Sequence, residues 1–133
     1  MERAVLMDSP FFFLLERSMY ETALVYITAF DKEEAETIAN SVITERLAAC
    51  ANILGDVSSI FLWKGAIQNE SEIGFFLKTA VEKIPLLTKR VSELHSYEEP
   101  CIIALPIIGG SEQFLDWIKT ETCLLYTSPS PRD

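Results

Sequence analysis

The sequence predicts an α+β protein with a ferredoxin-like, split βαβ arrangement: helices on one face of an antiparallel sheet. Runs of apolar and β-branched residues alternate with segments of helical periodicity in the order β-α-β-β-α-β-α. The chain has 133 residues, enough for one domain with a single core. We therefore expect one sheet, a long central hairpin and an extra C-terminal helix.

The first strand and the first helix are predicted between residues 22 and 47. Thr22–Thr28 is a short run of apolar and β-branched residues, typical of a central strand. Asp31 followed three residues later by Glu34 is a capping-box pattern, which predicts the start of a helix. Apolar residues then recur on one helix face as far as about Leu47: Ala35, Ile38, Ala39, Val42 and Ile43.

A long hairpin is predicted over residues 57–78. Apolar residues dominate its first arm up to Ile67 and its second arm from Ile73. The polar segment Gln68–Ser71 between them is expected to form the turn. Gly55 and Asp56 are expected to interrupt the first arm with a bulge or a turn.

The second half of the chain predicts a helix, a strand and a last short helix. The helix should begin near Glu82, because Pro85 is tolerated only in a first turn. Cys101–Ile108 is expected to be a buried strand with Pro106 near its end or on a sheet edge. Ser111 is predicted to cap the last helix.

The two ends of the chain differ in character from the domain predicted at residues 22–121. Residues 1–21 have no clear period and are expected to form a poorly ordered arm. Residues 122–133 are rich in Ser and Pro and are expected to be a disordered tail. Their ending, YTSPSPRD, resembles endings that recur on translated sequencing reads, so we interpret it as non-native.

Charge and cysteine content limit the partners and the location. The formal net charge is -9, with 11 Lys and Arg residues, which argues against nucleic-acid binding and favours cationic partners. Cys50, Cys101 and Cys123 form no C-x-x-C pair, so we expect neither a disulfide framework nor a zinc ribbon. The apolar run Phe11–Leu15 is too short to cross a membrane. We therefore expect a cytoplasmic protein without a membrane partner.

Four motifs together resemble one known family. ERLAACANI, SIFLWKG, LHSYEEP and GSEQFLDW occur in this order between residues 45 and 117. In these motifs the chain is similar to the CutA divalent-cation-tolerance family over roughly residues 22–121. The resemblance implies a ferredoxin-like homotrimer in which the long hairpins extend the sheets of neighbouring subunits. It also implies binding of divalent metal ions, notably Cu²⁺, in response to or tolerance of metal ions.

The segment SELHSYEEPC, residues 92–101, holds the candidate metal ligands. His95, Glu98 and Cys101 would offer an imidazole, a carboxylate and a thiolate, the mixed set that copper or zinc favours. One chain supplies a single imidazole, so a site at a subunit junction of the trimer is the more plausible arrangement. The competing interpretation of His95 needs no metal, because a histidine at a helix end interacts favourably with the helix dipole.

Trp63, Lys78 and Tyr97 are the candidate cleft or interface residues. We expect no enzyme, because the single histidine has no identifiable Ser or Cys nucleophile and residues 28–34 lack the Gly and Arg of a phosphate loop. The first functional hypothesis is a homotrimer that binds divalent cations. The alternative is a sensor or interaction module that receives a small molecule in clefts between subunits, as in the nitrogen-regulatory PII proteins that share this fold.

Overall fold

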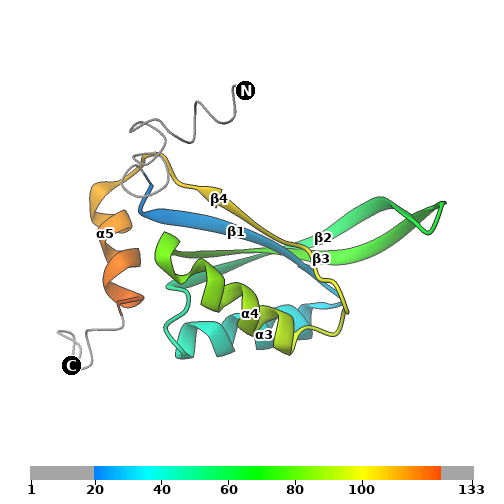
Figure 1. Ribbon diagram of the computed structural model, residues 1–133, viewed down its shortest axis with the longest axis horizontal. Coiled ribbons are helices and arrows are strands. Elements are labelled where there is room, and N and C mark those ends of the chain that lie inside the picture. Colours follow the sequence, from blue (N-terminus) through cyan, green and yellow to red (C-terminus); the bar gives the residue numbers. More distant parts are fainter. Residues whose placement is uncertain (1–19, 124–133) are drawn as a thin grey trace, which may run out of the picture.

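The computed structural model of the chain describes residues 20–123 and has a single four-stranded antiparallel sheet (Figure 1). The strand order is β2-β3-β1-β4, which confirms the predicted ferredoxin-like fold. The predictions for residues 1–19 and 124–133 lie outside the described residues. The elements are β1 (Thr22–Ala29), α3 (Lys32–Thr44), β2 (Cys50–Trp63), β3 (Ala66–Ala80), α4 (Ile84–Leu94), β4 (Ile102–Pro106) and α5 (Glu112–Glu121).

The core lies between the sheet and the helices α3 and α4, which cover one of its faces (Figure 1). Alternate residues of β1 and β3 point into this layer, as the period-2 geometry of strands requires. Removal of their side chains from water is the main source of stability. The largest fully buried side chains of the core are those of Val25, Ile27, Ile38, Val42, Phe75, Leu77, Leu87 and Val91.

The start of α3 confirms the predicted helix cap. Asp31 accepts a hydrogen bond from the Glu34 backbone N–H at 2.8 Å, and the Glu34 carboxylate accepts one from the Phe30 N–H at 2.8 Å. The helix ends at Thr44, three residues before the predicted end. Arg46 has a positive φ of 61°, the left-handed conformation that commonly terminates a helix.

The turn of the long hairpin lies at Lys64 and Gly65, so the predicted turn at Gln68–Ser71 is wrong. Both turn residues have positive φ, 51° and 81°, as a two-residue hairpin loop with right-handed strand twist requires. Gln68–Ser71 instead belong to β3 and pair with residues 58–61 of β2. The predicted interruption near Gly55 is confirmed, because the register shifts between Ile53 and Gly55.

The later elements follow their predicted signals closely. Pro85 lies in the first turn of α4, after a 3-10 turn over Val81–Lys83. β4 ends at Pro106, where the missing N–H costs no ladder bond. It is shorter than the predicted Cys101–Ile108, and the prediction that it is buried is wrong. Ile103 and Leu105 are exposed, because β4 lies at the edge of the sheet and pairs with β1 alone. Ser111 caps α5 by accepting from the Phe114 N–H at 3.4 Å. Thr122 differs from the disordered tail expected at residues 122–133, because it is buried and donates its hydroxyl to the Ile118 carbonyl of α5.

The far end of the β2–β3 hairpin projects beyond the helices (Figure 1) and has two different faces. Phe61 and Trp63 line a cavity on one face. Because side chains alternate along a strand, Ile60 and Leu62 point to the opposite face, where Leu62 pairs with Ile67. These three residues, which we call the aliphatic face, are 68%, 70% and 76% exposed.

Candidate functional site

A cavity of about 450 Å³ lies where the hairpin, the end of β1 and the turn after α4 meet. It opens on the sheet face opposite the core, because Glu72 alternates along β3 with the core residues Phe75 and Leu77. The cavity brings together four of the six side chains that the sequence singled out, namely Trp63, Tyr97, Glu98 and Cys101. Its other lining residues are Thr28, Phe61, Gln68, Glu70, Glu72 and Glu99.

The cavity is strongly acidic. Glu70, Glu72, Glu98 and Glu99 supply four carboxylates, and its lining includes no Lys, Arg or His. The like charges have no opposite charge in the lining, and the cavity walls focus their field toward any ligand that enters. Electrostatics therefore favour cations here and disfavour anions.

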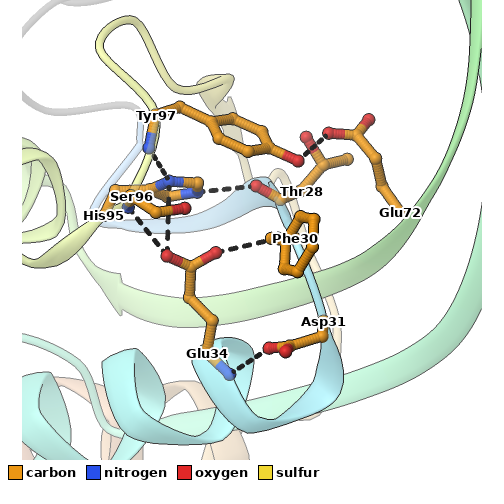
Figure 2. Close-up of polar contacts among 8 residues, drawn as sticks. All are labelled: Thr28, Phe30, Asp31, Glu34, Glu72, His95, Ser96 and Tyr97. Carbon is orange, nitrogen blue, oxygen red and sulfur yellow. Dashed lines mark hydrogen bonds and ion pairs between the residues drawn. The ribbon is translucent and has the colours of Figure 1, made fainter.

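Glu72 is the most buried of these carboxylates, with only 9% of its surface exposed. One of its oxygens accepts a hydrogen bond from the Tyr97 hydroxyl at 2.8 Å (Figure 2). Burial and the Glu72 carboxylate raise the pKa of Tyr97, so the hydroxyl keeps its proton at neutral pH and acts as donor. Within residues 20–123, the second Glu72 oxygen has no hydrogen bond and is not a buried unpaired atom, so it is open to the cavity.

His95 lies beside this cavity but does not line it. It caps the C-terminus of α4, as predicted, and its side chain is completely buried. Nε2 is 2.8 Å from the Thr28 carbonyl, which can only accept, and Nδ1 accepts from the Tyr97 N–H at 3.1 Å (Figure 2). This geometry assigns the neutral tautomer with the proton on Nε2. Both ring nitrogens are therefore occupied by the backbone.

The predicted trio of His95, Glu98 and Cys101 does not form a metal centre within one chain. Between residues 20 and 123, no group of three or more His, Cys, Asp or Glu side chains is arranged to hold a metal ion. The physical reason is the turn after α4, which buries His95 against β1 while it directs Glu98 and Cys101 to the cavity. Burial and the Glu72 charge raise the pKa of Cys101, so it is a thiol at neutral pH when no metal is bound.

Lys78, the third candidate cleft or interface residue, does not line the cavity. It is six residues beyond Glu72 on β3, about 20 Å at the usual rise of a strand. Its ammonium lies 5.3 Å from the ring centroid of Phe114 on α5. Lys78 thus belongs to the contact between β3 and α5.

Glu34 was not expected at the site, yet it ties α3 to the turn after α4. Its carboxylate accepts hydrogen bonds from the backbone N–H groups of Phe30 at 2.8 Å and Ser96 at 2.7 Å (Figure 2). Burial alone would raise the Glu34 pKa, but hydrogen bonds from Phe30 and Ser96 to the charged form outweigh it, so the pKa is lowered below 4.5. The sequence shows the capping box but not this second partner, which is 62 residues away.

Because the Glu34 pKa is lowered in the folded state, its contribution to stability is full above pH 4.5 and is lost as the pH falls through the lowered value. We expect Glu34→Gln to cost about 1–3 kcal/mol at pH 7 and less at pH 3. Urea denaturation at both pH values measures the difference. Glu36→Gln, a substitution at an exposed position of the same helix, should change the free energy of unfolding little at either pH. An equal cost of Glu34→Gln at both pH values would contradict the prediction.

Glu70 and Glu72 also line the cavity, although the turn predicted at Gln68–Ser71 would place them in or beside a loop. The sequence signal for this position is the spacing of Gln68, Glu70 and Glu72, because alternate residues of a continuous strand point to one face of the sheet. The wrong turn position concealed this pattern.

The chain is similar to proteins named for divalent-cation tolerance. It is 40% identical over 99 residues to "Protein CutA, chloroplastic" from Arabidopsis thaliana, covering 74% of this chain and 54% of that protein. It is 41% identical over 99 residues to "Divalent-cation tolerance protein CutA" from Thermus thermophilus, covering 74% and 96%. The structure of the periplasmic divalent cation tolerance protein CutA from Archaeoglobus fulgidus matches with a TM-score of 0.74 and 42% identity, covering 76% and 98%. The match thus spans about half the length of the plant relatives.

The location of this chain stays a prediction. The names of two relatives say chloroplastic and periplasmic, which differ from the cytoplasmic location expected from the sequence. Across residues 20–123, no helix combines the length and apolar character that a membrane crossing needs.

The family itself follows from the extent of these matches. The model of the CutA1 divalent ion tolerance protein matches residues 23–121, which include all four motifs quoted above. The same residues hold the hairpin, the acidic cavity and the buried His95. The chain belongs to the CutA1 divalent ion tolerance protein family.

Proposed function

We propose that this protein binds divalent metal ions, Cu²⁺ among them, as a homotrimer that acts in the response to or tolerance of such ions without catalytic turnover. The acidic cavity carries this proposal. Four carboxylates with no cationic neighbour in the lining attract a divalent cation. Names of relatives such as "Divalent-cation tolerance protein CutA" agree with this assignment.

The ligands we propose are carboxylate oxygens rather than the imidazole. Glu98 and Glu99 are exposed at the cavity and adjacent in the turn, so both can reach an ion without a change of fold. Carboxylates suit hard divalent ions, and Cu²⁺ binds a given site more tightly than the other first-row divalent ions. Because one chain has no group of three ligands among its described residues, we propose that a neighbouring subunit completes the set.

The double variant Glu98→Gln with Glu99→Gln is expected to weaken Cu²⁺ binding by about tenfold or more, because an amide lacks the charge of a carboxylate. Equilibrium dialysis measures affinity and stoichiometry. Glu33→Gln is the matched control, since it removes an exposed carboxylate of α3 that does not line the cavity. Equal affinities in the double variant and the unaltered protein would remove this site from consideration.

The homotrimer rests on two exposed apolar surfaces. The aliphatic face of the hairpin, Ile60, Leu62 and Ile67, lies in solvent in a single chain. On the opposite sheet edge, β4 exposes Ile103 and Leu105 and has a free hydrogen-bonding side. We propose that the hairpin of one subunit packs on this edge of the next, as the family resemblance implies.

The alternative function, a small-molecule sensor or interaction module, has one observation in its favour. The cavity volume of about 450 Å³ lies within the range of small-molecule sites and far exceeds the space of one ion. A thermal-shift screen with divalent metals and organic ligands separates the two functions, because a bound ligand stabilises the folded state.

A further inference from the structure

We propose that the cavity binds an aliphatic polyamine, a flexible methylene chain that carries at least two ammonium groups. This inference goes beyond metal binding, because a bare ion uses neither the volume of the cavity nor its aromatic walls. The proposal rests on three features of the same cavity: a buried carboxylate with an open oxygen, three aromatic rings, and further carboxylates that are exposed.

The buried carboxylate of Glu72 is the first anchor. It is 9% exposed, and the Tyr97 hydroxyl holds one of its oxygens while the other stays open to the cavity. A charge-assisted hydrogen bond from an ammonium group would satisfy that oxygen. The surrounding protein weakens solvent screening, so this interaction is stronger than at the surface.

The aromatic walls come from Phe61, Trp63 and Tyr97. Their faces provide apolar contact for methylene groups and attract ammonium groups through the ring quadrupole. Trp63 already has such a neighbour, since the Lys64 ammonium lies 5.9 Å from its ring centroid. Trp63 is half exposed in a single chain.

The exposed carboxylates of Glu70, Glu98 and Glu99 are the second anchor. The cavity therefore has one buried carboxylate, Glu72, and three exposed ones, and its lining also includes aromatic rings. A diamine reproduces this pattern, with cationic ends and an apolar centre. A nucleotide or another organic anion is disfavoured, because the lining includes four carboxylates and no basic side chain.

Isothermal titration calorimetry of the full chain at low salt tests the proposal with 1,4-diaminobutane as the probe. We expect saturable binding with one site per chain. The neutral analogue 1,4-butanediol should give no binding heat, because it lacks both charges. Mg²⁺ should bind about tenfold more weakly, because it carries the same charge without methylene groups.

Two cavity variants and one matched control locate the site. Glu72→Gln keeps an oxygen that can accept from Tyr97 but removes the charge, and Trp63→Leu removes a half-exposed ring. Each should weaken 1,4-diaminobutane binding by about tenfold. Glu33→Gln on α3 should leave it unchanged.

Three results would overturn the polyamine site: no saturable binding of 1,4-diaminobutane, Mg²⁺ affinity equal to that of the diamine, or equal weakening in Glu33→Gln. The last two would show attraction by charge alone.

Cu²⁺ dialysis of Trp63→Leu separates this proposal from the metal proposal. Loss of the diamine with unchanged Cu²⁺ affinity supports the aromatic contact, whereas loss of Cu²⁺ alone would refute it.

Discussion

Replacement of His95 by alanine is expected to lower the free energy of unfolding by about 2–4 kcal/mol. The ring is fully buried, and it joins the Thr28 carbonyl of β1 to the Tyr97 N–H in the turn after α4. Alanine would leave a void and two backbone groups without their partners. The loss should therefore appear as lower stability and not as the loss of a metal ligand.

Urea denaturation measures this cost, and Cu²⁺ dialysis under folding conditions measures the number of ions bound. Ser92→Ala, an exposed change on the same helix, is the control and should alter neither quantity. We expect His95→Ala to retain the Cu²⁺ stoichiometry of the unaltered protein. A variant of unchanged stability that binds no Cu²⁺ would show instead that His95 is a ligand.

Local signals made most of the fold predictable. The Asp31 cap, Pro85 in a first helical turn and the Ser111 cap each depend on a few neighbouring residues, and the structure has all three. The interruption at Gly55 is of the same kind, because its φ of 117° is a conformation that glycine adopts readily. Elements specified by nearby residues could thus be read from the sequence.

The hairpin turn was misplaced because polarity was interpreted as solvent exposure. Gln68–Ser71 are polar within a strand, since Gln68 and Glu70 face an open cavity rather than the core. The true turn depends on positive φ at Lys64 and Gly65, and Lys is not a residue that signals such a conformation.

The hydrogen-bond partners of His95 could not be predicted for a different reason, namely their distance from it in the sequence. The position of His95 at the C-terminus of α4 depends on neighbouring residues only, and the sequence predicts it. Its hydrogen bond to Thr28 joins residues 67 positions apart, and only the pairing of whole elements brings them together. The same limit applies to Lys78, whose position on β3 follows from the strand register.

Leu62→Lys combined with Ile67→Lys is expected to convert the proposed homotrimer into a monomer. The two residues are cross-strand partners on the aliphatic face, and both are largely exposed in a single chain. Lysine should therefore not disturb the fold of the chain. In the proposed interface, however, it would bury two unpaired ammonium groups, at a cost of roughly several kcal/mol each.

Light scattering measures the effect, with a mass of three times 15.0 kDa expected for the unaltered protein and 15.0 kDa for the variant. Ile43→Lys with Leu86→Lys is the matched control, because it adds the same charge to exposed apolar positions outside the hairpin. A monomeric unaltered protein, or a variant that stays trimeric, would contradict the proposed interface. Because a neighbouring subunit is proposed to complete the metal site, Cu²⁺ binding and trimer mass should be lost together. Full Cu²⁺ affinity in a folded monomer would mean that Glu98 and Glu99 need no second chain.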